Sequence, residues 1–154
     1  MFLGIDCGTQ GTKALLLDAA TGTVLGEGSA SHELISGPNG RREQATDEWI
    51  EAFEKATATA LAQAGVKGEA VLGIGVSGQQ HGLVTLDAEG RVLRPAKLWC
   101  DTESTAENQR LLDWLGGEAG SLRRLGVAIA PGYTLSKLLW MKEQHPALFE
   151  RIAH

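Results

Sequence analysis

Cysteine and proline are scarce in this chain of 154 residues, which contains two cysteines and four prolines. Cys7 and Cys100 belong to no CxxC or Cys/His pattern, so a disulfide framework and a zinc site are both excluded. We expect the two thiols to behave as small hydrophobic side chains in a reducing compartment.

Long apolar runs and basic clusters are also missing. No run of about 18 apolar residues occurs, and Asp6 interrupts an apolar start that has no positive flank, which excludes a membrane span or secretory leader. Fourteen basic residues stand against 19 acidic ones, for a formal charge of −5, without a cluster that could line a nucleic-acid groove. A soluble cytoplasmic protein with no nucleic-acid or membrane partner is the expectation.

The length suits one domain over residues 1–154 with a sizeable core. Residues 73–78 match the pattern GxGxxG, but the glycines lie within an apolar strand pattern and no helix follows them. A dinucleotide fingerprint must open a helix, so this match is rejected.

The first 18 residues organise the rest of the chain. An apolar run ends in Asp6, a second ends in Asp18, and a loop rich in glycine and threonine joins them, which predicts a β-hairpin. Backbone N–H groups in such a loop, with Lys13 beside them, can bind an anion, and Asp6 suits Mg²⁺. The alternative is an ordinary hairpin in which Asp6 caps a turn.

The remaining pattern alternates between strands, turns and helices. A third strand over 23–32 completes an antiparallel meander, and 36–43 is expected to form an exposed loop. A helix runs from Thr46 to Gly65 with Trp49 and Phe53 as core anchors, and Ser104 with Glu107 fits a capping box. The other expected elements are strands over 70–76, 83–86, 92–93 and 95–99, and helical segments over 104–115, 121–125, 134–140 and 146–152.

Polar side chains stand at the ends of three apolar strands. They are Asp6 with its loop, the segment Gln79-Gln80-His81, and Trp99 with Asp101. Ligands gather at strand ends in open sheets, so these groups are candidates for one cleft. Taken singly, each would more often be a turn residue with satisfied hydrogen bonds, and Trp99 a core residue.

Three stretches carry a specific resemblance. GIDCGTQGTKALLLD, GVSGQQHGLVTLDAEGRVLRPAKLWCD and PGYTLSKLLWMKEQHPALF together resemble the N-terminal domain of the FGGY carbohydrate kinases, and within them the xylulokinase branch. The segment Gly78-Gln79-Gln80-His81-Gly82 is the most discriminating part. The resemblance implies an α/β fold of the ribonuclease H-like type (actin-like ATPase superfamily), with a mixed sheet and helices on both faces.

The same resemblance implies roles for individual residues. Asp6 would hold Mg²⁺ through water near the phosphates of ATP, and Lys13 would lie beside the phosphate loop. That loop would consist of Gly8, Thr9, Gln10, Gly11 and Thr12. The sugar side would consist of Gln80, His81, Trp99 and Asp101. Family members often carry an arginine two positions after this aspartate, where this chain has Glu103.

The implied function is transfer of phosphate from ATP to D-xylulose in pentose catabolism. In the family, a C-terminal lobe binds the adenine and supplies the general base, so residues 1–154 alone should be inactive. A homodimer of the full-length enzyme is also expected. Three alternatives stay open: another FGGY kinase for ribulose, gluconate or glycerol, an actin-like or chaperone-type ATPase domain, and a stand-alone binding module.

Overall fold

The computed structural model describes residues 1–154, which form two compact units. The first contains Met1–Leu34 and Ala45–Gln79, and the second contains Ile35–Gln44 and Gln80–His154. The units are described one at a time. None of the helices has the length and apolar character needed to cross a membrane.

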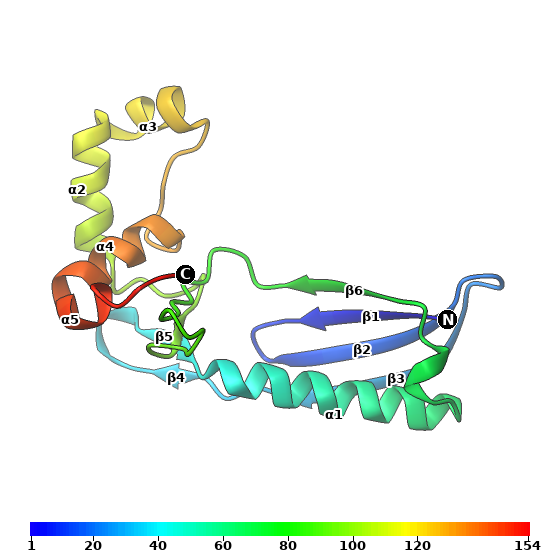
Figure 1. Ribbon diagram of the computed structural model, residues 1–154. Helices are drawn as coiled ribbons and strands as arrows, with labels where there is room; N and C mark the ends of the chain where they lie inside the picture. The colour runs from blue at the N-terminus through cyan, green and yellow to red at the C-terminus, as the bar shows by residue number, and fades with distance from the viewer. The chain divides into compact units, whose positions relative to one another are not determined.

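The first unit is built on a four-stranded sheet. Its strands are β1 (Phe2–Cys7), β2 (Gly11–Asp18), β3 (Thr23–Ser31) and β6 (Gly73–Gly78), in the order β3-β2-β1-β6. The first three pair antiparallel, while β6 runs parallel to β1 (Figure 1). The predicted hairpin, meander and mixed sheet are confirmed.

One long helix, α1 (Thr46–Ala64), packs on β3 and β2 and ends at Gly65, as predicted (Figure 1). Its buried residues are all alanines, and they face glycines on β3: a Cβ on Gly28 would overlap the carbonyl oxygen of Ala56. Backbones this close leave no room for large side chains. Phe53 is consequently only partly buried against the core, and Trp49 lies outside that core cluster, contrary to its expected place.

Strand β6 forms an open edge of this sheet. Ile74 and Val76 pair in register with the buried Leu3 and Ile5, yet they are 56% and 72% exposed because α1 covers β3 and β2. The strand begins at Gly73, later than expected, because a 3₁₀ turn occupies Gly68–Ala70. An apolar face of the sheet is therefore left uncovered beside β1.

A small three-stranded sheet begins the second unit. It consists of β4 (Ile35–Ser36), β5 (Arg42–Gln44) and β7 (Ala96–Lys97), with a 3₁₀ turn over Pro38–Gly40. The exposed loop predicted over 36–43 is confirmed around the turn, but its end was wrong, since Glu43 lies in β5 and is buried. The strands expected over 83–86 and 92–93 shrink to isolated bridges, Leu83 with Lys97 and Leu86 with Val92.

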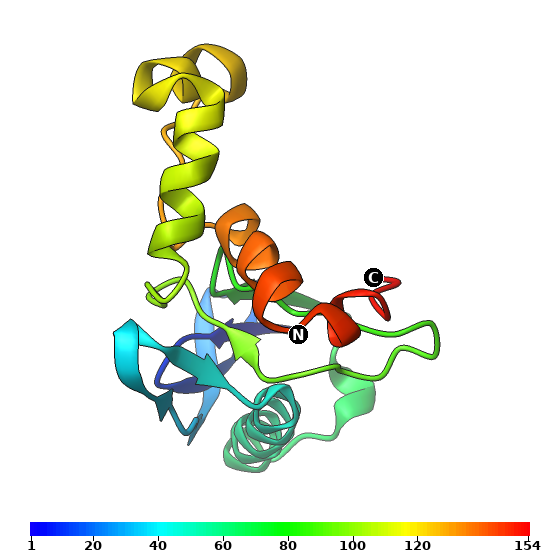
Figure 2. The ribbon, with the colours of Figure 1, turned by 90° about the vertical axis from the view of Figure 1, so that its left-hand side faces the viewer.

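Four helices complete the second unit: α2 (Thr105–Leu115), α3 (Gly117–Leu125), α4 (Thr134–Gln144) and α5 (Pro146–Phe149) (Figure 2). Helix α2 begins where predicted, but the capping box was wrong. The Ser104 hydroxyl donates to the carbonyl of Pro131 at 3.1 Å, and Glu107 pairs with Arg110 at 3.3 Å. Ser104 thus joins two segments of the chain, while the helix start has no side-chain cap.

Candidate active site

Asp6 lies near the end of β1, with its side chain exposed and without a hydrogen bond or ion pair inside the chain. Its register partner on β2 is Lys13, which is also exposed, so the two charges lie across from each other on one face of the sheet. An unpaired carboxylate at a strand end is free to bind a hard cation through oxygen. This observation fits the Mg²⁺ role expected of Asp6.

The loop after β1 is held in place by two side chains. Gly8 donates its N–H to the Gly11 carbonyl at 3.0 Å, and its own carbonyl accepts from Gln79 Nε2 at 3.3 Å and faces His32 Nδ1 at 3.1 Å. In a neutral imidazole, Nδ1 must then carry the proton, so the Thr12 hydroxyl donates to Nε2 at 2.9 Å. His32 was not predicted as part of this site, and Gln79 was named only in the segment Gln79-Gln80-His81, not with the phosphate loop.

The five predicted loop residues differ in exposure. Gln10 is exposed, and Thr9 donates its hydroxyl to Gln79 Oε1 at 3.1 Å. Thr12 lies on β2 with its side chain fully buried against His32, so it shapes the loop from inside. Gly8, Thr9, Gln10 and Gly11 therefore provide the accessible part of the predicted phosphate loop.

In the second unit, Gln80 and His81 are both exposed. His81 adopts a left-handed backbone conformation, with φ of 60°, and its ring stacks on Tyr133 with centroids 4.3 Å apart and planes at 16°. Such a backbone is uncommon for a residue other than glycine. The stack fixes the imidazole against an aromatic face, an arrangement that suits binding of a hydroxylated ligand.

Trp99 and Asp101 were predicted together, but their environments differ. Trp99 is 52% exposed, whereas Asp101 is fully buried. Asp101 Oδ1 accepts the N–H of Glu103 at 3.0 Å, and Oδ2 accepts the N–H of Arg42 at 2.7 Å and the ammonium of Lys97 at 2.8 Å. Asp101 is therefore enclosed and fully hydrogen bonded.

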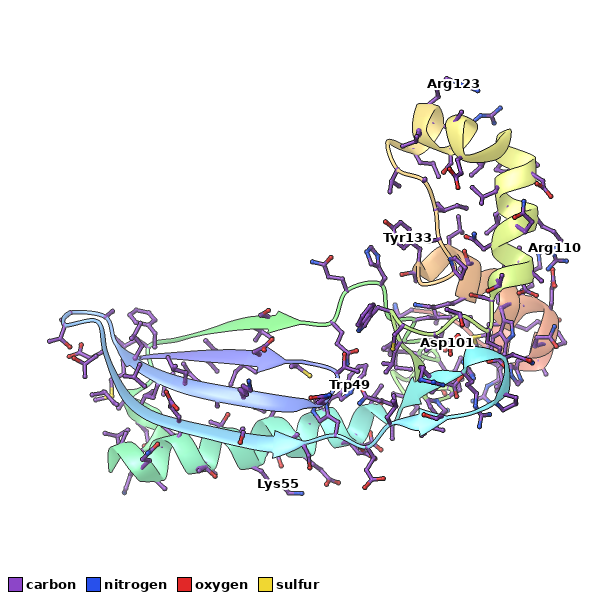
Figure 3. All side chains as sticks on the ribbon, turned by 180° about the vertical axis from the view of Figure 1, so that it is seen from behind. Trp49, Lys55, Asp101, Arg110, Arg123 and Tyr133 are labelled. Atoms are coloured by element: carbon purple, nitrogen blue, oxygen red, sulfur yellow. The ribbon has the colours of Figure 1, made fainter.

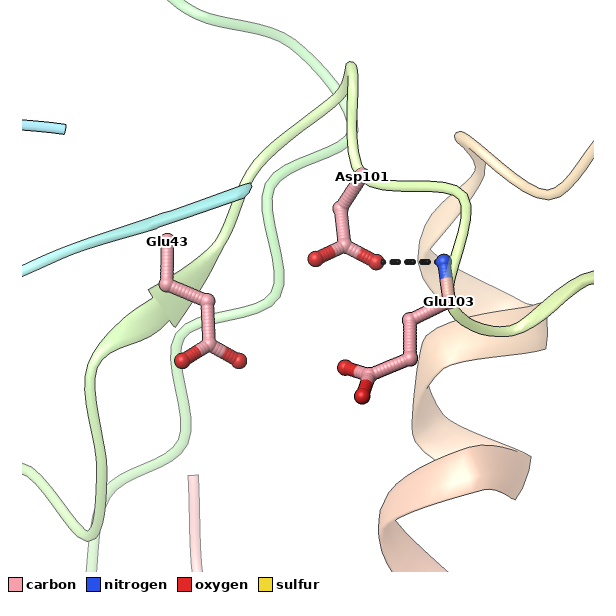
Figure 4. Close-up of side chains that lie close together, drawn as sticks. All are labelled: Glu43, Asp101 and Glu103. Carbon is pink, nitrogen blue, oxygen red and sulfur yellow. Dashed lines mark hydrogen bonds between the residues drawn. The ribbon is translucent and has the colours of Figure 1, made fainter. Parts of the chain in front are cut away.

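Three carboxylates approach one another around Lys97. They belong to Glu43, Asp101 and Glu103, whose oxygens lie within 4.8 Å of one another (Figure 4). The buried ammonium of Lys97 lies 2.6 Å from Glu103, 2.8 Å from Asp101 and 3.6 Å from Glu43. The lysine supplies the positive charge that these carboxylates need, so the cluster is an ion-pair network.

Aromatic and cationic groups surround this network. Lys97 Nζ lies 4.1 Å from the centre of the Trp140 ring, and Arg94 lies 4.9 Å from the same ring while pairing with Glu43 at 2.5 Å. His145 contacts the edge of Trp140, and burial, followed by the nearby charge of Arg94, lowers its pKa. The pair Glu43 and Lys97 thus connects β5 and β7 to α4.

The model for the FGGY family of carbohydrate kinases, N-terminal domain, matches residues 1–154. The chain belongs to this family. Its sequence is 51% identical to the xylulose kinase of Haemophilus influenzae over 99% of this chain and 32% of that protein. It is 41% identical to the xylulose kinase of Streptomyces coelicolor over 95% of this chain and 29% of that protein.

The solved structures agree with the sequence comparison. The xylulose kinase from Rhodospirillum rubrum matches with a TM-score of 0.91 and 29% identity over 99% of this chain and 31% of that chain. The actin-like ATPase fold that the FGGY resemblance implied is therefore confirmed. The chain spans about a third of the length of these relatives.

Sequence reasoning missed the residues that hold the site together. Tyr133 and Lys137 lie in a stretch quoted for its family resemblance, but nothing in the spacing shows that Tyr133 stacks on His81 across 52 positions. Lys97, in the strand expected over 95–99, was not singled out in the sequence. Glu103, which stands where family members often carry an arginine, forms an ion pair with Lys97.

Proposed function

We propose that these residues form the N-terminal domain of an ATP-dependent kinase that phosphorylates D-xylulose to D-xylulose 5-phosphate. The observation that carries the proposal is the exposed His81, which has a left-handed backbone and a ring stacked on Tyr133, within a chain that is 51% identical to a xylulose kinase. A histidine with only a structural role in the core would be buried and would have an ordinary backbone conformation, unlike His81.

Each predicted residue has a role in this proposal. The Asp6 carboxylate would hold Mg²⁺ through water, and Gly8, Thr9, Gln10 and Gly11 would bind phosphate oxygens, with Lys13 adding positive charge. When bound, Mg²⁺ and ATP supply charge neutralisation and the phosphoryl group. Thr12 would act from inside the loop through His32.

On the sugar side, Gln80 and His81 would donate and accept hydrogen bonds to hydroxyls, and Trp99 would supply an exposed wall. Asp101 is enclosed, so in the proposal it supports the Trp99 segment through Arg42 and Lys97. Positioning of this kind contributes much of the rate in phosphoryl transfer, because the protein has little covalent chemistry to perform.

The proposal also includes a second lobe. Relatives are about three times as long as this chain, and the uncovered Ile74 and Val76 on β6 are the kind of surface that another part of a larger protein would bury. We propose that this lobe supplies the adenine pocket and the general base. Residues 1–154 alone should then release no ADP in the presence of D-xylulose.

The test is a coupled ADP-release assay on the full-length kinase with D-xylulose, ribulose, gluconate and glycerol. We expect D-xylulose to give the highest kcat/KM. Asp6→Ala should lower kcat far more than it weakens sugar binding, because it removes a group that acts on the phosphate side. His81→Ala should instead cost about 1–3 kcal/mol in sugar recognition.

Three results would contradict the proposal or one of its residue roles. Highest activity with another sugar would assign the chain to another branch of the family, and sugar-independent ATP hydrolysis would favour the actin-like ATPase alternative. Near-normal turnover in Asp6→Ala would leave Asp6 as a turn residue.

A further inference from the structure

Lys137 on α4 has an unusual environment for a cation. Its side chain is fully buried, and its Nζ donates to two backbone carbonyls, that of His81 at 2.7 Å and that of Gly132 at 2.6 Å, with no carboxylate in an ion pair. Burial lowers its pKa to about 8, opposed by the negative charge of Asp101. Since a neutral amine still has two hydrogens for two carbonyls, both bonds survive loss of the charge.

The first carbonyl belongs to the residue with the strained backbone. A left-handed conformation costs free energy for a residue with a side chain, and it persists only where neighbouring groups hold it. The bond from Lys137 fixes the direction of the His81 carbonyl at that residue. The backbone conformation of His81 also sets the direction of its Cα–Cβ bond, from which the imidazole ring extends.

The second carbonyl belongs to Gly132, the residue before Tyr133, which is labelled in Figure 3. The Tyr133 ring is the other half of the stack. Gly132 also lies so close to the Trp99 backbone that a Cβ would overlap the Trp99 carbonyl oxygen. One buried amine therefore joins the segment that carries His81 to the segment that carries Tyr133, next to the backbone of Trp99.

We propose that Lys137 is a positioning residue for sugar recognition, which holds the His81 and Tyr133 rings in the stacked arrangement that meets the sugar hydroxyls. This inference rests on the proposed function for the role of His81. It adds Tyr133 to the sugar side. Lys137 acts on the sugar only by positioning the two rings and does not contact the substrate.

The kinetic test compares Lys137→Met with Lys142→Met in the full-length kinase. Lys142 is an exposed lysine on the same helix, so the control makes the same chemical change without touching either carbonyl. We expect Lys137→Met to raise the KM for D-xylulose about tenfold, which corresponds to loss of one well-placed hydrogen bond. The KM for ATP should stay unchanged, and Lys142→Met should resemble the parent.

A double-mutant cycle separates positioning from a general structural role. If Lys137 acts through the imidazole, Lys137→Met should cost little in kcat/KM for the sugar once His81 is already alanine. Fully additive losses would overturn the proposal. Tyr133→Leu provides a second variant that leaves the buried lysine in place, should Lys137→Met fail to fold, and it must also be non-additive with His81→Ala.

A readout without substrate separates this inference from the proposed function. In protein labelled with ¹³C-histidine, the His81 ring resonance, assigned from its absence in His81→Ala, should shift in Lys137→Met and remain in place in Lys142→Met. An unmoved resonance in Lys137→Met would refute the positioning role even if xylulose is the substrate. A parent enzyme that ignores xylulose would refute the proposed function while a shifted resonance still supported the positioning.

Discussion

Replacing Lys97 by methionine tests the ion-pair network of the second unit. The substitution keeps an unbranched chain that can pack on Trp140 but removes the ammonium shared by Glu43, Asp101 and Glu103. Removing one partner of a buried ion pair costs about 3–5 kcal/mol, because a charge is left buried without compensation.

The surroundings decide where in that range the loss should fall. Glu43 keeps Arg94 at 2.5 Å, and Asp101 keeps the N–H groups of Arg42 and Glu103. Glu103, whose side chain is 17% exposed, can turn toward water. Each carboxylate retains some compensation, so we expect a loss near the lower limit, about 3 kcal/mol.

Urea unfolding followed by tryptophan fluorescence and circular dichroism measures this loss. Lys55→Met is the matched control, because Lys55 pairs with Glu51 on the surface of α1 at 3.5 Å with both side chains mostly exposed (Figure 3). Such a pair is worth about 1 kcal/mol or less. Glu103→Gln should destabilise the parent but restore part of the stability of Lys97→Met. If Lys97→Met costs no more than Lys55→Met, the argument about the network is refuted.

Two further predictions concern stability. Gly28→Ala should destabilise the first unit by about 1–3 kcal/mol in urea unfolding, because its Cβ would overlap the Ala56 carbonyl. The control Gly75→Ala, with open space around the new Cβ, should be near neutral. Equal effects of the two substitutions would contradict the close helix-sheet contact. Hydrogen bonds, first that from the Arg91 N–H, lower the pKa of Asp87 below 3.8, so its stabilising effect is present above that pH and is lost as the pH falls through the lowered pKa. Asp87→Asn should therefore be less stable than the parent at pH 7 and approach it at low pH; a difference independent of pH would contradict this reasoning.

The sequence predicted the first unit better than the second because its signals are local. The hairpin and the meander follow from apolar runs with glycine-rich turns between them, and α1 follows from its alanine spacing and Gly65. The position of Trp49 was wrong because glycines on β3, distant in sequence, decide how close the helix comes. Helix periodicity alone does not show that the facing strand carries glycines, whose missing side chains let the helix come close.

In the second unit, long-range polar contacts replace local patterns. Glu43 looked like part of an exposed loop because charged residues surround it, but Lys97 and Arg94 bury it from more than 50 positions away. Asp101 was predicted to lie on the sugar side, but its enclosure by backbone donors was not visible in the sequence. The stack of His81 on Tyr133 escaped prediction for the same reason.

The parallel pairing of β1 with β6 has a consequence for synthesis of the chain on the ribosome. Phe2 pairs with Gly73, so 71 further residues must be synthesised after Phe2 before β6 can begin to pair with β1. At about 5–20 residues per second, that wait lasts roughly 4–14 seconds. The hairpin with β2 forms within this time and protects only one edge of β1. During translation, the backbone N–H and C=O groups on the other edge of β1 therefore stay without a strand partner until β6 has been made.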